Sequence, residues 1–147
     1  MRLGVTLELP REEPSVPVVR HLLGGSLRKL GVSEECVSDI ELAMTEACTN
    51  VLRHATSEDD SYEVRVGLSA GMCTIRILDT GHGFDYTTLV AAETSAETGR
   101  GIQLMEAVVD AIDFESRPEK GMIVRLVKEL EISPGTPLGR LLERTPA

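Results

Sequence analysis

The sequence predicts an α+β protein in which helices cover one face of a mixed, mostly antiparallel sheet, so that the fold has two layers. Two observations lead to this prediction. Segments with alternating apolar residues follow one another as hairpins, whereas apolar residues at helical spacing fall in separate, grouped segments. The chain has 147 residues, which is the size of one domain that can bury a core without disulfides.

The chain opens with a strand and a helix. Apolar and other residues alternate over residues 3–9, which is typical of a half-buried strand, and Pro10 closes it. From about Pro14 to Leu30 the apolar residues recur at helical spacing. Gly24 and Gly25 each weaken the middle of this helix by about 1 kcal/mol. We therefore expect a helix with a soft centre.

A second helix and a hairpin follow. The helix is predicted from about Ser33 to His54, because Glu34-Glu35 in its first turn favour the positive end of a helix dipole. Residues 62–68 and 73–78 then show the two-residue alternation of strands. Ala70-Gly71 lies between them, so the two strands are predicted to form a hairpin.

The second half contains a long segment without a clear period. A glycine-rich run to Gly83 is followed by a polar stretch from Tyr86 to Thr98, and a loop of that length in a compact domain is usually functional. The segments predicted after it are a helix over residues 102–109 and a hairpin of strands 112–116 and 122–128. The tail from Ile132 carries three prolines, so we expect a mobile C-terminal tail.

Charge and composition exclude several classes of protein. The chain has 24 acidic and 15 basic side chains, a formal net charge of −9, which disfavours binding to the nucleic-acid backbone. No apolar run approaches the roughly 20 residues of a membrane span. Cys36, Cys48 and Cys73 lie in apolar segments and are expected to be buried thiols. The N-terminus lacks the pattern of a signal peptide, so a cytoplasmic location is expected.

A carboxylate and an amide form the first candidate site. Glu46 and Asn50 are four residues apart in the predicted second helix, so they lie on one face, beside its apolar stripe. An amide oxygen can coordinate Mg²⁺, and a carboxylate can accept a proton from an attacking hydroxyl. Alternatively, the pair belongs to an ordinary solvated helix face.

Two glycine-rich segments form the other candidate sites. Asp79-Thr80-Gly81-His82-Gly83 follows a strand, where an aspartate can accept a hydrogen bond from a ligand amino group and glycines permit close backbone approach. Thr98-Gly99-Arg100-Gly101-Ile102 opens a helix, where free backbone N–H groups and the dipole favour phosphate. Each segment alone is also compatible with a simple turn.

In this order, the three segments resemble the N box, the G1 box (D-x-G-x-G) and the G2 box (G-x-G) of the GHKL, or Bergerat-fold, ATPases. The resemblance covers roughly residues 3–130. It implies a histidine-kinase-like ATPase domain over residues 1–131, with an ATP lid at about residues 84–98 and a tail at 132–147. The length and the run E-A-C-T-N-V-L-R-H are similar to the anti-sigma-factor serine/threonine kinases of the RsbW/SpoIIAB type.

That resemblance implies a function and a set of roles. Members bind a sigma factor and use ATP with Mg²⁺ to phosphorylate an anti-anti-sigma protein of the STAS type, in a partner switch, commonly as homodimers. Carried over residue by residue, Glu46 is the catalytic base, Asn50 is the Mg²⁺ ligand and Arg20 is a partner-binding residue. The ATP-binding residues are then Asn50, Arg53, Asp79, Gly81, Gly83, Thr98, Gly99, Arg100, Gly101 and Ile102.

One departure from the family pattern keeps a second function open. Relatives often have a threonine after the glycine of the last hairpin, whereas Gly121 is followed here by Met122 and Ile123. The alternative is therefore an ATP-binding anti-sigma protein without kinase activity.

A third possible function is the catalytic module of a two-component histidine kinase. His21 would then be the only candidate phosphate acceptor in the first helix. Such modules commonly have Asn at the position of Glu46.

Overall fold

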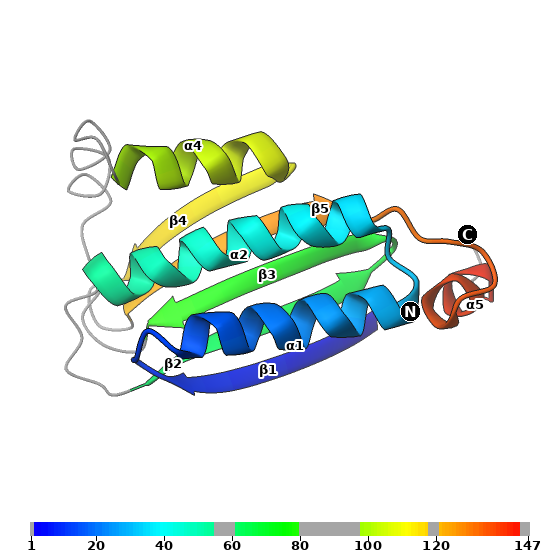
Figure 1. Cartoon of the computed structure of the whole chain (residues 1–147), viewed down its shortest axis with the longest axis horizontal. Coiled ribbons are helices and arrows are strands. Elements are labelled where there is room, and N and C mark those ends of the chain that lie inside the picture. Colours follow the sequence, from blue (N-terminus) through cyan, green and yellow to red (C-terminus); the bar gives the residue numbers. More distant parts are fainter. Residues whose placement is uncertain (1, 55–60, 80–97, 118–120, 145–147) are drawn as a thin grey trace.

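The computed structural model describes residues 2–54, 61–79, 98–117 and 121–144, and its architecture confirms the predicted two-layer α+β class. The sheet has five strands in the order β1-β2-β3-β5-β4, and each neighbouring pair is antiparallel. The strands are β1 (Arg2–Pro10), β2 (Ser61–Ser69), β3 (Met72–Asp79), β4 (Ala111–Arg117) and β5 (Gly121–Glu129). The helices α1 (Ser15–Leu30), α2 (Glu34–His54) and α4 (Thr98–Val108) lie over one face of the sheet, and α5 (Pro137–Glu143) lies at one end (Figure 1).

The central helix α2 organises the helical layer. It packs against α1 on one side and α4 on the other, above β3 and β5. Its predicted apolar stripe is buried, with no member more than 1% exposed: Val37, Ile40, Met44, Ala47 and Val51. Because this stripe faces the sheet, the residues that border it point along the seam between α2 and its neighbouring helices.

The hairpin between β2 and β3 forms where the sequence predicts it. Ala70 and Gly71 both have positive φ angles, 51° and 76°, as the favoured two-residue hairpin turn requires. The register then aligns Tyr62 with Asp79 at the far end of the two strands. The turn therefore fixes the position of Asp79 at the end of β3.

The strand β1 is less buried than its alternation suggests. Leu9 is only 8% exposed, but Leu3 is 39% and Val5 is 46% exposed. The reason is topological, because β1 is an edge strand with a neighbour on one side only. The outer side of α1 beside it also carries exposed apolar residues, Val18 and Leu22.

Helix α1 forms where the sequence predicts it and is continuous across its two glycines. Gly24 is buried against α2, and a Cβ placed there would lie 2.7 Å from Oε2 of Glu41. A side chain at this position would therefore force the carboxylate of Glu41 to move. At Gly25 a Cβ would meet nothing within 4 Å.

The C-terminal segment also differs from expectation, because residues 137–143 form α5 instead of a mobile tail. Thr136 caps the helix by accepting a hydrogen bond from the N–H of Gly139 at 3.2 Å, and Pro137 occupies the first turn, where proline is tolerated. Leu138 is only 1% exposed. Burial of this one leucine anchors the segment beside α1, with which α5 is in contact.

Two expectations from the composition can be compared with the structure: that the cysteines are buried thiols, and that no segment spans a membrane. All three cysteines are buried and free, as predicted. Burial raises the pKa of the Cys48 and Cys73 thiols to about 12, so both are held as neutral, unreactive thiols. None of the described helices is both long enough and apolar enough to cross a membrane.

We expect Gly31→Ala to lower the free energy of unfolding by at least about 2 kcal/mol. Gly31 ends α1 in the left-handed region at φ 109°, and its N–H donates to the carbonyl of Arg28 at 3.2 Å. A Cβ there would also collide with the side chain of Thr136. Urea unfolding measures the loss.

Gly25→Ala is the matched control, and because its Cβ meets open space it should stabilise the helix by about 0.5–1 kcal/mol. Equal effects of the two substitutions would contradict this account.

Candidate functional site

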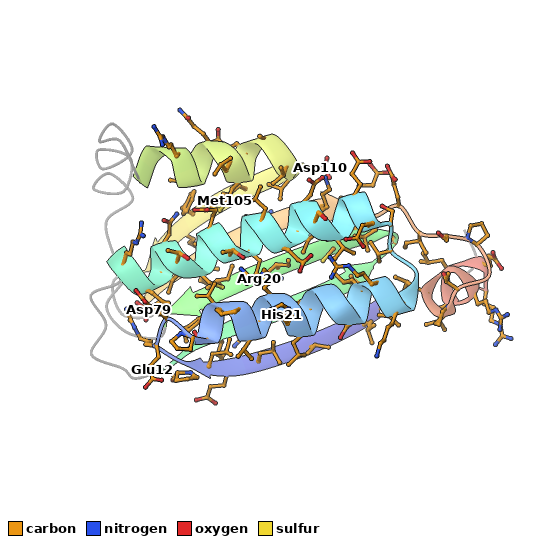
Figure 2. All side chains as sticks on the ribbon, viewed as in Figure 1. Glu12, Arg20, His21, Asp79, Met105 and Asp110 are labelled. Atoms are coloured by element: carbon orange, nitrogen blue, oxygen red, sulfur yellow. The ribbon has the colours of Figure 1, made fainter. Side chains whose placement is uncertain are left out.

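The three candidate segments meet at one end of the molecule. The C-terminal part of α2, the end of β3 and the start of α4 all lie at the left of Figure 1. They come from residues 46–54, 79 and 98–102, so the sheet and the central helix bring together groups that are far apart in the chain. Figure 2 places the side chain of Asp79 at this same end.

Glu46 on α2 lies directly against the first turn of α4. A Cβ placed on Gly101 would be 2.8 Å from Oε2 of Glu46 and 3.8 Å from Oδ1 of Asn50. Gly101 is buried. Any larger residue at position 101 would displace the carboxylate from this place. A carboxylate next to a helix N-terminus is stabilised by the helix dipole. The structure thus brings the predicted pair and the glycine segment into one site.

The amide of Asn50 is buried near the contact between α2 and α4. Its residue is only 3% exposed, and among the described residues its Nδ2 has no hydrogen-bond partner. Buried polar groups in proteins are nearly always hydrogen-bonded. An unpaired side-chain amide beside a helix start indicates a place where a polar ligand completes the hydrogen bonding.

The start of α4 supplies backbone and one exposed cation. The helix begins at Thr98, as the glycine-rich segment suggested, and the side chain of Arg100 is exposed. The first N–H groups of a helix have no partner within the helix. Ile102 is only 4% exposed and belongs to the hydrophobic core, so its side chain anchors the helix and only its backbone can face a ligand.

Asp79 ends β3 as a fully buried carboxylate, with no exposed surface. Its Oδ1 accepts a hydrogen bond from Nη1 of Arg11 at 3.0 Å, and the arginine side chain is itself only 13% exposed. Burying a charge is costly unless it is paired and hydrogen-bonded. The ion pair therefore allows a charged aspartate to sit at the base of the site.

Arg11 is a residue of this site that the sequence did not reveal. It follows β1 directly, and its Nη2 also approaches the carbonyl of Val51 at 3.4 Å, among the last carbonyls of α2, where a cation is favourable. The contact with Asp79 spans 68 positions in the chain. In the sequence, Arg11 is simply an arginine followed by Glu12 and Glu13. This pattern is also typical of a solvated turn, so it did not predict a role in the site.

Arg53 and Arg20 lie on two different helices, α2 and α1. Arg53 is exposed and lines a hollow of about 300 Å³ together with Arg11, Thr49 and Leu52. The described residues that line this hollow come from α1, α2 and the segment between β1 and α1, and none of them belongs to α4. Arg20 is half-buried on α1, which is the neighbouring helix (Figure 2).

Several predicted residues fall outside the described part of the chain. These are Gly81 and Gly83 of the second segment and nearly all of the expected lid, residues 84–97. Within the described residues, no three His, Cys, Asp or Glu side chains are gathered so that they could hold a metal by themselves.

We expect Gly101→Ala to impair the site without unfolding the protein. The added methyl group would meet the end of a flexible side chain, Glu46, which can move aside. The carboxylate of Glu46 would then leave its position. Any activity that depends on a ligand bound at this site should therefore fall by about tenfold or more. The midpoint of urea unfolding should change little. Gln103→Ala, at an exposed position of the same helix, is the control. A fully active Gly101→Ala protein would show that this contact has no role.

The sequence model of the family described as Histidine kinase-like ATPase domain matches residues 9–128. Among curated proteins, the serine-protein kinase RsbW of Bacillus velezensis and that of Bacillus subtilis are each 28% identical over 138 residues, spanning 86% of this chain and 85% of theirs. The protein of the same name from Bacillus cereus is 25% identical over the same length.

Two solved structures share the fold. A crystal structure of RsbU and RsbW domains from Mycobacterium tuberculosis aligns with a TM-score of 0.69 and 19% identity over 91% of this chain. This chain spans only 34% of that longer one. The histidine kinase domain of a blue-light activated kinase from Erythrobacter litoralis aligns with a TM-score of 0.55 and 15% identity, covering 92% of this chain and 66% of that one. At these identities the likeness extends to the fold alone.

Proposed function

Because this chain belongs to the histidine kinase-like ATPase domain family, we propose that it is an ATP- and Mg²⁺-dependent serine/threonine protein kinase that also acts as an anti-sigma factor. In this proposal it binds a sigma factor in one state and phosphorylates an anti-anti-sigma protein of the STAS type in the other. The similarity to proteins named serine-protein kinase RsbW supports this choice within the family. The ATPase domain is taken as residues 1–131, with the lid at about residues 84–98.

The observation that carries the proposal is the position of Glu46 against the first turn of α4. A helix start favours phosphate, and a carboxylate beside it can accept the proton of an attacking hydroxyl. In the proposed step, the serine or threonine oxygen forms a bond to the γ-phosphorus of ATP while the bond to the β-phosphate oxygen breaks. The hydroxyl proton passes to the carboxylate of Glu46, and ADP leaves.

Asn50 fits the role of a Mg²⁺ ligand in its chemistry and in its burial. Mg²⁺ prefers oxygen donors and is commonly held by one or two protein side chains together with substrate phosphates. The side-chain oxygen of Asn50 lies beside Gly101, and its Nδ2 has no partner among the described residues, so the amide could turn its oxygen toward a cation. When bound, Mg²⁺ would offset the charge of the phosphates.

Asp79 and the basic residues complete the proposed nucleotide site. A buried carboxylate can accept a hydrogen bond from the adenine amino group, which guanine lacks at that position. Arg11 holds one oxygen of this carboxylate and so fixes its orientation. Arg100 at the start of α4 is proposed to face the phosphates. Arg53 lines the hollow beside Arg11 and is proposed to contact the nucleotide from that side. Gly81, Gly83, Thr98 and Gly99 are proposed to contribute backbone.

The proposed partner surface lies on the neighbouring elements. Arg20 on α1 is proposed to contact both protein partners, which would make them mutually exclusive. A homodimer is proposed through β1 and α1. Its support is the apolar surface that these elements leave exposed, formed by Leu3, Val5, Val18 and Leu22, next to the free edge of the sheet. Exposed apolar patches commonly mark interfaces.

Phosphate transfer from labelled ATP tests the proposal. The protein is incubated with γ-labelled ATP, Mg²⁺ and a panel of anti-anti-sigma proteins, and the products are analysed for phosphoserine and phosphothreonine. Label on a serine or threonine of a partner is expected. ATP binding without transfer to any partner would favour the alternative of a binding protein without kinase activity, and acid-labile phosphate on the protein itself would favour the histidine kinase reading.

We expect the affinity for the sigma factor to fall as the salt concentration rises. The chain carries a formal net charge of −9, and DNA-binding segments of sigma factors are basic, so attraction between the two should be screened by salt. Titration calorimetry at low and high ionic strength measures this dependence. An affinity that does not change with salt would contradict a role for the acidic surface.

A further inference from the structure

The start of α1 receives little stabilisation from its own sequence. Pro14 stands at the N-cap, where a proline side chain has no oxygen that could accept from the first N–H groups of the helix. The first turn, Ser15-Val16-Pro17, carries no acidic residue that would interact favourably with the helix dipole. The position of this helix start therefore depends on contacts with other elements.

Two contacts with the sheet hold the start of α1. The hydroxyl groups of Ser15 and of Tyr62 on β2 share a buried hydrogen bond at 2.6 Å. Four residues earlier, Arg11 donates to Asp79 on β3 at 3.0 Å and approaches the carbonyl of Val51 on α2 at 3.4 Å. The short segment that leads from β1 into α1 is thus attached at both of its ends.

The two attachment points on the sheet lie side by side. The register pairs Tyr62 of β2 with Asp79 of β3, and side chains directly opposite each other on antiparallel strands are about 4.5–5.5 Å apart at Cβ. Both residues are fully buried. Figure 2 places Glu12 of the connecting segment and Asp79 at the same end of the molecule. The carboxylate that is proposed to bind adenine therefore belongs to the cluster that holds the start of α1.

A bound nucleotide would act on this cluster through Asp79. An ionised carboxylate has about four lone-pair sites, so it can accept from an adenine amino group while it still accepts from Arg11. A ligand that covers the carboxylate also excludes water, and the attraction between opposite charges is stronger at a lower dielectric constant. Nucleotide binding should thus strengthen the ion pair and not replace it.

We propose that Arg11 couples the nucleotide site to the start of α1, so that a nucleotide bound at Asp79 holds the segment from Arg11 to Val16 more firmly. This coupling rests on the proposed function, since it takes Asp79 as the adenine-binding carboxylate. Arg11 is a positioning residue in it and takes no part in phosphoryl transfer. The same helix carries Arg20, so the effect would extend to the surface that is proposed for the protein partners.

Amide hydrogen exchange tests the coupling on the intact protein. The N–H groups of Ser15 and Val16 donate to carbonyls of the connecting segment, so their exchange reports opening of the start of α1. With a non-hydrolysable ATP analogue and Mg²⁺, both amides should exchange at least about fivefold more slowly, the lower end of ordinary coupling between sites. The hydrogen-bonded amide of Arg140 on α5 is the reference and should change much less. In Arg11→Met with saturating analogue, the slowing at Ser15 and Val16 should be lost.

Coupling between two sites is reciprocal, which gives a second test that leaves Arg11 and Asp79 in place. Ser15→Ala removes the buried hydrogen bond to β2 and so loosens the start of α1. It should therefore weaken binding of the analogue by about fivefold. Ser26→Ala is the matched control, because Ser26 is an exposed serine of the same helix whose hydroxyl donates to a carbonyl one turn earlier. It should leave the affinity unchanged, and circular dichroism checks that each variant is folded.

The possible failures can be told apart. Shifts of the Asn50 and Gly101 signals with unchanged exchange at the start of α1 would overturn the coupling and leave the nucleotide site intact. Equal slowing in the α5 reference would assign the effect to the stability of the whole fold, and slowing that persists in Arg11→Met would exclude Arg11 as the link. Equal affinities of the two serine variants would also overturn the coupling. An analogue that shifts no signal would contradict the proposed nucleotide site as well.

Discussion

Glu46→Gln should lower the rate of phosphoryl transfer to an anti-anti-sigma protein by about 10²–10⁴-fold and leave ATP affinity almost unchanged. Glutamine has nearly the same shape, so the packing against Gly101 is kept. It cannot accept the proton of the attacking hydroxyl. In this account the carboxylate acts on the hydroxyl and not on the nucleotide, and the loss should therefore appear in the rate at saturating ATP.

Single-turnover transfer of labelled phosphate measures this loss, and calorimetry measures ATP binding by the same preparation. Glu106→Gln is the matched control, because Glu106 is an exposed glutamate of α4 with no proposed role. Transfer at the rate of the unmodified protein would exclude Glu46 as the base. A loss of ATP binding of the same size would instead assign Glu46 to nucleotide binding.

Arg11→Met should lower the free energy of unfolding by about 3 kcal/mol. The substitution removes one partner of a buried ion pair whose aspartate is fully buried and whose arginine is 13% exposed. The methionine keeps much of the volume of the arginine stem, so loss of charge is the main change. Because Arg11 also orients the proposed adenine carboxylate, ATP affinity should fall together with stability.

A double-mutant cycle separates the ion pair from other effects. Asp79→Asn combined with Arg11→Met should be more stable than the sum of the single effects predicts, because the buried charge is then removed with its partner. Glu12→Gln, next to Arg11 and exposed, serves as the control. Urea unfolding measures the four proteins of the cycle and the Glu12→Gln control. A change below about 0.5 kcal/mol in Arg11→Met, typical of surface substitutions, would show that the pair contributes little.

Local patterns predicted most of the fold. The alternation in β2 and β3, the Ala70-Gly71 turn and the apolar stripe of α2 were each encoded within a short segment, and the structure confirms all three. The features that the sequence did not reveal depend on contacts between distant segments. In the sequence, Gly24 looks like a weak point of the helix. The structure shows that Glu41 of α2 lies against it, and no local pattern predicts this contact.

The same distinction applies to the candidate site. Glu46 and Asn50 could be placed together because helical spacing is local, and the glycine segment could be placed at a helix start. The contact between Glu46 and Gly101, and the ion pair between Arg11 and Asp79, both join segments brought together only by the sheet. Likewise, the fold of the tail depends on a buried place for Leu138, which no local pattern indicates.

The central claim is that α2, the start of α4 and the end of β3 form one nucleotide site, and binding of a non-hydrolysable ATP analogue tests it most directly. The ¹⁵N-labelled protein is titrated with the analogue and Mg²⁺. The account predicts shifts of the Asn50 side-chain amide and of the backbone amides of Gly101 and Asp79, with signals of α5 unchanged, and weaker binding when Mg²⁺ is chelated. Absence of binding, or shifts that leave Asn50 and Gly101 unaffected, would contradict it.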